Sequence, residues 1–372
     1  MKKIKFLFLF TLINLIIFEL FSLSICNLLN LCTSPSYSLK IKNNNHWVNH
    51  DLYGVWHKPN SSYIHKSDCF SAKYNFNNFG AKDKKRTTNG KNRTLLIGDS
   101  YVEGYGVDND KNFSYLIENN SKHEIEYLNF SSSGYFGSTQ YYILIKDLLK
   151  KIEFDRVILF LNPASDFEDD SFDFAKLFHD KKYRPYYDLN TNEIFYYNQN
   201  YQLKINQNNS IKSILDNFTY SYKLLRYLKQ QIGLFLKKKH INNISNISDG
   251  NYISYFDKYP KKTFEILKRN LFNINNLLLE NEIRLIVSTV PSKKDIVYFN
   301  SKNNSKNNLD NELKKYLDNM DVKFFKIMQL NDKNNMIELD SYFTCNDHFN
   351  EVGQRILFNI IKEKLLLINE KY

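Results

Sequence analysis

The chain of 372 residues is short of cysteine, proline and glycine, with 4, 6 and 11 copies of these residues. None of the cysteines stands in the CxxC spacing that zinc sites use, so the sequence predicts no metal site. Hydrophobic residues make up 42% of the chain and aromatic residues 16%, which is enough apolar material for a substantial core. The length allows one large domain or two modest ones.

The chain also lacks a concentrated patch of positive charge, although its formal net charge is +11. A nucleic-acid-binding surface would gather its lysines into a stripe with aromatic residues between them. Here the lysines are dispersed, and the compact run Lys237-Lys238-Lys239 is typical of a solvated helix end. The sequence therefore predicts no nucleic-acid partner.

The N-terminus carries one long apolar run. Lysines at positions 2, 3 and 5 precede the segment 6–26, which is about as long as a helix that crosses a bilayer. The lysines predict a cytoplasmic N-terminus and an exported remainder. No small-x-small cleavage site is evident, so residues 1–27 are predicted to be a signal anchor, with a cleaved signal peptide or a lipid anchor as alternatives. Glu19 interrupts the run and either marks a helix contact or is tolerated in lipid.

An exported domain lies in a compartment where disulfides form. Cys26 stands at the membrane boundary, and the sequence admits a pair between Cys32 and Cys69, which leaves Cys345 unpaired.

Beyond the anchor, residues 28–90 are polar and irregular, and residues 91–372 alternate between two periodicities. Apolar runs predict strands at 94–98, 126–130, 156–161, 284–289 and, more weakly, 322–327. Helical spacing predicts helices at 141–152, 261–279, 309–319 and 351–368. Strands that alternate with helices predict an α/β fold with a central parallel sheet and helices on both faces.

An insertion at about 183–255 breaks this alternation. Residues 187–196 predict a hairpin, 211–237 an amphipathic helix and 242–251 a loop rich in Asn and Ser. The insertion is either a cap over the active site or a purely structural excursion.

One strand ends in a chemically suggestive turn. The run 95–97 is followed by Gly98-Asp99-Ser100, which places a serine hydroxyl at the carboxyl edge of the sheet. Ligands bind at that edge in open α/β sheets. Such a serine is a nucleophile if a base reaches it.

A candidate base lies near the C-terminus. His348 stands in the polar segment 346–353, directly before the last predicted helix, and is flanked by groups that can orient an imidazole. A histidine base needs an acceptor on its far ring nitrogen.

Together these segments resemble the SGNH hydrolases, the GDSL-like esterase and lipase superfamily, and more narrowly its membrane-anchored bacterial branch. The resemblance covers about residues 74–368 and implies a flavodoxin-like three-layer sandwich. It implies Ser100 as the nucleophile, His348 as the base, and the backbone N–H groups of Ser100 and Gly134 as oxyanion donors.

Two positions depart from the family pattern. Where the family has an oxyanion-binding asparagine this chain has Ser165, with Asn162 as an alternative donor. Where the family has an aspartate before the histidine this chain has Asn346, while Asp347 is adjacent to the histidine. We predict Asp347 as the orienting group and Asn346 as its alternative, although side chains of adjacent extended residues point to opposite faces.

The resemblance implies a serine esterase or O-acyltransferase that acts on an acylated small molecule or on acyl groups of a cell-envelope glycan. Such an enzyme needs no cofactor. The anchor predicts that the domain lies on the outer side of the cytoplasmic membrane, and if the signal is cleaved the domain is secreted. The departures raise one alternative to the enzyme, a catalytically impaired domain that binds glycan or scaffolds an envelope complex.

Overall fold

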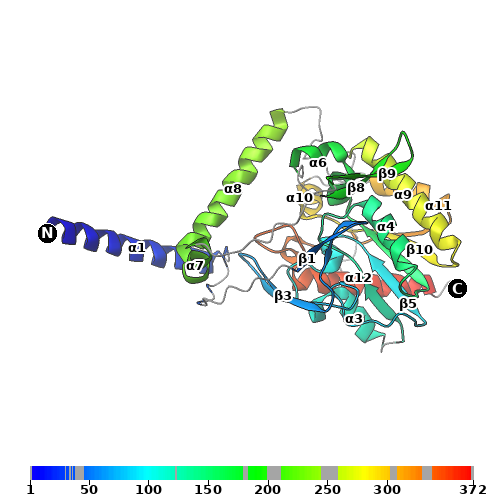
Figure 1. The fold of residues 1–372 in the computed structure, drawn as a ribbon, viewed down its shortest axis with the longest axis horizontal. Helices are drawn as coiled ribbons and strands as arrows, with labels where there is room; N and C mark the ends of the chain where they lie inside the picture. The colour runs from blue at the N-terminus through cyan, green and yellow to red at the C-terminus, as the bar shows by residue number, and fades with distance from the viewer. Residues whose placement is uncertain are drawn as a thin grey trace.

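The fold is described from a computed structural model (Figure 1). The structure describes the whole chain except for residues 1, 30, 33–34, 36, 38–45, 122–123, 179–182, 199–210, 244–258, 302–307, 329–336 and 370–372.

The domain is built on a five-stranded parallel sheet with the strand order β11-β10-β7-β5-β6. The strands are β5 (Arg93–Ile97), β6 (Glu126–Asn129), β7 (Arg156–Leu161), β10 (Arg284–Thr289) and β11 (Lys323–Lys326). All five residues of β5 are buried, as expected for a central strand that is covered on both faces. The predicted parallel sheet is confirmed.

Helices cover both faces of the sheet and complete three layers (Figure 1). Leu95 and Ile97 pack in one apolar cluster with α4 (Ser138–Leu148), α9 (Lys261–Leu279) and α11 (Asn308–Asp318). Leu96, between them, packs in the opposite cluster with α3 (Phe113–Asn120), α10 (Lys293–Ser301) and α12 (Glu351–Asn369). Alternate residues of one strand therefore contribute to two separate cores.

The region 28–90, predicted to be irregular, contains two antiparallel hairpins. They are β1 (Trp47–His50) with β2 (Gly54–His57), and β3 (Ser61–Lys66) with β4 (Ser71–Phe76). Exposed and buried residues alternate strictly along β4, which buries Ala72, Tyr74 and Phe76. The strands are short, and aromatic side chains pack across each hairpin, Trp47 on His57 and Tyr63 on Tyr74, which the local sequence does not reveal.

The insertion forms the predicted hairpin from β8 (Arg184–Asp188) and β9 (Glu193–Tyr197). The single predicted helix is two helices, α7 (Ile211–Phe218) and α8 (Tyr220–Asn243). Figure 1 shows that α8 runs from the N-terminal helix α1 (Lys2–Leu28) back toward the domain. The predicted loop at 242–251 lies almost entirely outside the described residues.

Helix α1 is long and apolar enough to cross a membrane, and little of its apolar window is buried by the rest of the protein. Within the described residues it is the one helix that meets this test.

Two disulfides link the four cysteines, Cys26–Cys32 and Cys69–Cys345. The expected pair of Cys32 with Cys69 is wrong, and Cys345 is not free. The chain turns back at the end of α1, where Leu31 N–H donates to Cys26 O, and this turn brings Cys32 to Cys26. Cys69 lies in the turn between β3 and β4, which meets the loop before α12.

Candidate active site

Ser100 lies where the sequence predicts it, at the carboxyl edge of the sheet. β5 ends at Ile97, and Ser100 is the first residue of the short helix α2 (Ser100–Glu103). The Asp99 carboxylate accepts from Tyr101 N at 2.9 Å and caps this helix. Gly98 is required between strand and cap, because a Cβ there would lie 2.7 Å from Val102 Cγ2. The tight turn fixes the serine hydroxyl above the sheet edge.

His348 approaches Ser100 from the loop before α12. The loop closes on itself as Phe343 N–H donates to His348 O at 2.9 Å, and Asn350 Oδ1 accepts from Gly353 N at 3.0 Å to cap the helix. His348 Nε2 lies 2.7 Å from Ser100 Oγ. This is the distance at which a base takes a proton directly. The structure thus brings together two residues 248 positions apart.

Asn346 is the residue that holds the far side of the imidazole. Its Oδ1 lies 3.3 Å from His348 Nδ1 and also accepts from His348 N at 2.9 Å. With a proton on Nδ1, the free lone pair of the ring is on Nε2, which faces Ser100. This is the tautomer that a base requires.

Asp347, the predicted orienting group, is not the residue that faces His348 Nδ1 in the structure. Its side chain is exposed, and its backbone carbonyl accepts from Tyr101 Oη at 2.5 Å. Because Asp347 and His348 are adjacent, their side chains diverge. The turn is closed by the Asn346 side chain, whose Oδ1 accepts from His348 N. The alternative residue, Asn346, occupies the orienting position.

Tyr105 was not predicted as a site residue. Its ring stacks on the His348 imidazole with centroids 4.2 Å apart and planes 25° apart. The glycines on either side, Gly104 and Gly106, have φ of +79° and +85°, a conformation that favours glycine. The Gly-Tyr-Gly sequence 104–106 is the signal that could have identified this ring.

Burial lowers the pKa of His348 to about 4, and His65 lowers it further while the Glu103 carboxylate opposes the shift. A base must be neutral, and an imidazole is neutral above its pKa. We therefore expect esterase activity to rise through about pH 4 and to stay level through neutral pH. The measurement is kcat/KM for p-nitrophenyl acetate against pH, and a midpoint near the ordinary histidine value would contradict the expected burial.

The predicted oxyanion donors differ in availability. Ser100 is in the first turn of α2, where backbone N–H groups have no partner within their own helix. Gly134 N–H donates to Ser132 Oγ over a long 3.2 Å contact, and a Cβ at Gly134 would meet Val55 Cγ2 at 2.8 Å. Both backbone groups remain candidate donors.

Ser165 does not match its predicted role. Its hydroxyl, with one proton to give, lies 2.8 Å from Asp99 Oδ2 and 3.3 Å from Asn162 O. Burial raises the pKa of Asp99 to about 7, although the bond from Ser165 opposes this. The Asn162 side chain is fully buried, and both its amide atoms lack a partner among the described residues. Asn162 thus stays the alternative candidate for a third donor.

Glu103, the last residue of α2, lies in a buried cluster with His57 and Lys82. Glu103 Oε1 lies 3.1 Å from His57 Nε2, and Glu103 Oε2 accepts from Ser133 N at 2.8 Å. Burial opposes ionisation, but His57 and the buried Lys82 outweigh it and lower the pKa of Glu103 to about 2. Glu103 thus joins the nucleophile helix, the hairpin β1–β2 and the loop that carries Gly134.

Replacement of Glu103 by glutamine is expected to lower the free energy of unfolding by about 3 kcal/mol, because it removes the carboxylate that the buried His57 and Lys82 side chains face. Urea unfolding followed by circular dichroism measures the change. The control is Glu193→Gln, at the exposed first residue of β9, for which we expect a change within about 0.5 kcal/mol. Equal stabilities for the two variants would contradict this role.

Among the described residues, no group of three or more His, Cys, Asp or Glu is arranged to hold a metal ion.

No protein-family model and no curated protein matches the chain. Solved structures do match. A psychrotrophic esterase, EstA, from Pseudoalteromonas sp. is 10% identical, with a TM-score of 0.40 over 75% of this chain and 100% of its own. A lipolytic protein of the G-D-S-L family from Veillonella parvula DSM 2008 is 11% identical, with a TM-score of 0.37 over 73% of this chain and 96% of its own.

The periplasmic domain of a lipopolysaccharide acetyltransferase from Salmonella ser. Paratyphi A is 10% identical, with a TM-score of 0.34 over 75% of this chain and 85% of its own. What the chain can do chemically follows from its own geometry at Ser100 and His348.

Proposed function

We propose that this chain is a serine-dependent acyl-transfer enzyme, an esterase or O-acyltransferase of the SGNH type. The observation that carries the proposal is the 2.7 Å contact between Ser100 Oγ and His348 Nε2, with Asn346 Oδ1 on the other ring nitrogen. A hydroxyl, a neutral imidazole and an acceptor in this order are the groups that acyl transfer requires.

In the proposed reaction His348 Nε2 removes the proton from Ser100 Oγ as the oxygen attacks an ester carbonyl. The negative charge that develops on the carbonyl oxygen is stabilised by N–H of Ser100 and Gly134, with the Asn162 amide as a third donor. His348 then gives its proton to the leaving alcohol, and an acyl-serine remains. Water or a sugar hydroxyl, deprotonated by His348, releases the acyl group and restores Ser100.

The proposed substrate is an acyl ester of a cell-envelope glycan, with the domain on the exported side of the cytoplasmic membrane. An apolar helix of 27 residues and two disulfides support this setting, because disulfides persist in oxidising compartments. Lysines 2, 3 and 5 favour a cytoplasmic N-terminus.

A second candidate is a domain with impaired catalysis that binds glycan. Two observations favour it. The Ser165 hydroxyl is engaged by Asp99, and Asn346 brings no charge to stabilise an imidazolium.

A fluorophosphonate probe separates these candidates, because it forms a covalent bond only with an activated serine. The full chain in detergent is expected to be labelled, and Ser100→Ala to show no label. Absence of label on the folded wild-type chain would overturn the enzyme and favour the binding domain. An acyl donor supplied with oligosaccharides, followed by mass spectrometry, distinguishes a transferase from an esterase.

A further inference from the structure

The helices α7 and α8 present apolar side chains to solvent, although they belong to a polar insertion. The exposed fraction of these side chains runs from 38% for Leu215 to 76% for Ile211. On α8 they are Leu225, Leu228 and Ile232, which are spaced by three and four residues and therefore share one helix face. We call the exposed residues Ile211, Ile214, Leu215, Leu225, Leu228 and Ile232 the apolar stripe.

The apolar stripe continues from a contact with the candidate membrane helix. Tyr220 and Leu224, at the start of α8, are buried in a cluster with Cys26 and Cys32 at the end of α1. Leu228 lies one turn beyond Leu224 on the same side of the helix. The face of α8 that packs on α1 thus continues beyond this contact, and there its side chains are exposed.

Glu19 fixes the start of α8 against α1. Its carboxylate accepts from Tyr220 N at 2.5 Å and from Ser221 N at 3.0 Å, two N–H groups of the first turn of α8. A carboxylate at a helix N-terminus is stabilised by the helix dipole. This contact accounts for an acidic residue inside an otherwise apolar segment, and it joins α1 to the insertion.

The position of Glu19 along α1 sets the depth of α7 and α8. A hydrocarbon core needs about 20 residues of helix, which from Phe6 ends near Cys26. Glu19 precedes Cys26 by about seven residues, or about 10 Å of helix. Amphipathic helices at a membrane surface bury their apolar face by about 5–10 Å. The start of α8 therefore lies at the depth of an interfacial helix.

We propose that α7 and the first half of α8 lie in the outer leaflet of the membrane that α1 spans, with the apolar stripe against the acyl chains. The partner is the phospholipid surface around α1, because the apolar stripe adjoins the helix that is long and apolar enough to cross a membrane. The inference rests on the anchorage proposed above and not on catalysis.

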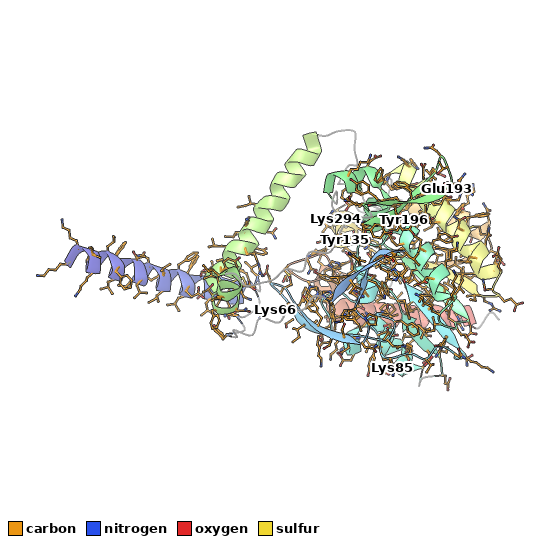
Figure 2. All side chains as sticks on the ribbon, in the orientation of Figure 1. Lys66, Lys85, Tyr135, Glu193, Tyr196 and Lys294 are labelled. Atoms are coloured by element: carbon orange, nitrogen blue, oxygen red, sulfur yellow. A yellow bond between two sulfur atoms is a disulfide. The ribbon has the colours of Figure 1, made fainter. Side chains whose placement is uncertain are left out.

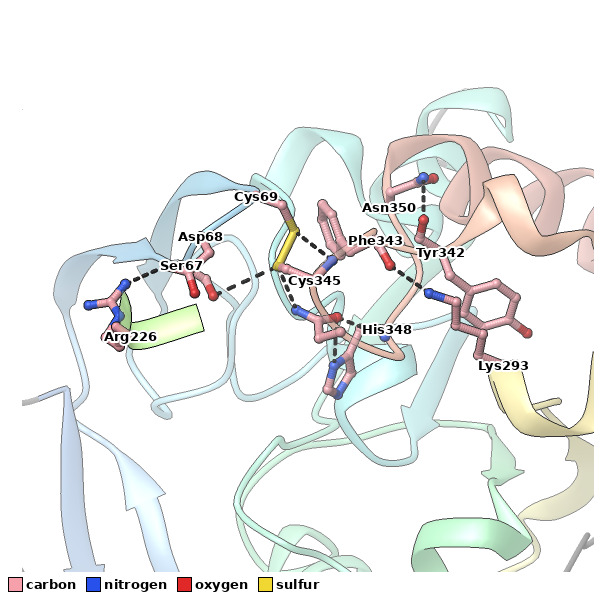
Figure 3. Close-up of a disulfide and its surroundings, with 11 residues drawn as sticks. Ser67, Asp68, Cys69, Arg226, Lys293, Tyr342, Phe343, Cys345, His348 and Asn350 are labelled. Carbon is pink, nitrogen blue, oxygen red and sulfur yellow. Dashed lines mark hydrogen bonds and ion pairs between the residues drawn. A yellow bond between two sulfur atoms is a disulfide. The ribbon is translucent and has the colours of Figure 1, made fainter. Parts of the chain in front are cut away.

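Helix α8 is connected to the candidate active site by a short series of contacts (Figure 3). Arg226 on α8 forms an ion pair with Asp68, the neighbour of Cys69. Cys69 is bonded to Cys345, and Asn346 and His348 follow. Contact of α8 with lipid thus holds the loop that carries His348 on the membrane side of the domain.

The test is quenching of tryptophan emission by brominated acyl chains, with the full chain in vesicles of phosphatidylethanolamine and phosphatidylglycerol. Ile214→Trp and Leu228→Trp place a new indole on the apolar stripe. Each variant adds the emission of one new indole to that of Trp47 and Trp56. We expect brominated lipid to quench this added emission by about half or more, because the new indole lies among acyl chains.

The matched control is Glu193→Trp, at the opposite end of the molecule from α1 (Figure 2), for which we expect no lipid-dependent quenching. Leu225→Trp repeats the test if either stripe variant fails to fold. Quenching no greater than that of Glu193→Trp would overturn the proposal, as would a cross-linked dimer joined through the stripe. The variant pair Ser100→Ala and Leu228→Trp is expected to quench like Leu228→Trp alone, so loss of activity and loss of lipid contact remain distinguishable.

Discussion

Replacement of His348 by alanine is expected to lower kcat/KM for p-nitrophenyl acetate by about a thousandfold, in the range of general acid–base catalysis by a positioned side chain. Ser100 Oγ has His348 Nε2 at 2.7 Å as its base. Without the imidazole the hydroxyl keeps its proton, and the leaving alcohol receives none. Thermal unfolding of the variant is the control for fold.

Two further variants separate the roles of the neighbouring residues. Asp347→Asn is expected to change kcat/KM by less than about twofold, because the exposed side chain lies apart from the ring and the backbone carbonyl bound by Tyr101 is kept. Asn346→Asp is expected to raise it by about tenfold or more, because a carboxylate at Nδ1 stabilises the imidazolium that forms. If Asp347→Asn is the damaging change and Asn346→Asp is neutral, the loop adopts a different turn from the one described.

The contrast between these residues shows where the sequence was informative about the site. Ser100 and His348 each lie at a boundary that periodicity reveals, the first at the end of an apolar strand and the second directly before an amphipathic helix. The choice between Asn346 and Asp347 depends on a turn closed by a side chain on the His348 backbone. A local hydrogen bond of this kind has no periodic signature.

The fold shows the same division. The strands predicted at 94–98, 126–130, 156–161 and 284–289 overlap β5, β6, β7 and β10 closely, because buried parallel strands are continuous apolar runs. The hairpins in residues 28–90 escaped prediction because their short strands are stabilised by aromatic contacts between strands. The disulfide partners also escaped it, because Cys69 and Cys345 are 276 residues apart and meet only through tertiary structure.

Removal of the Cys69–Cys345 disulfide is expected to lower the stability of the chain strongly. The bond closes a loop with a sequence separation of 276, and chain entropy gives it about 5 kcal/mol of stabilisation. The double variant Cys69→Ser and Cys345→Ser is expected to lose about this much free energy of unfolding, which urea denaturation in detergent measures. It is also expected to lose activity, because Cys345 adjoins Asn346, whose side-chain oxygen Oδ1 orients His348.

The control is the double variant Cys26→Ser and Cys32→Ser. Its disulfide closes a loop with a sequence separation of only 6, for which the same relation gives about 2 kcal/mol. This bond lies at the end of α1, away from the loop that carries His348, so the variant is expected to keep its esterase activity while it becomes less stable. Equal activity losses in the two double variants would mean that stability alone, and not the position of the His348 loop, limits the reaction. Loss of activity confined to Cys69→Ser with Cys345→Ser, at a temperature where both variants are folded, is the result expected if the disulfide holds Asn346 against the imidazole.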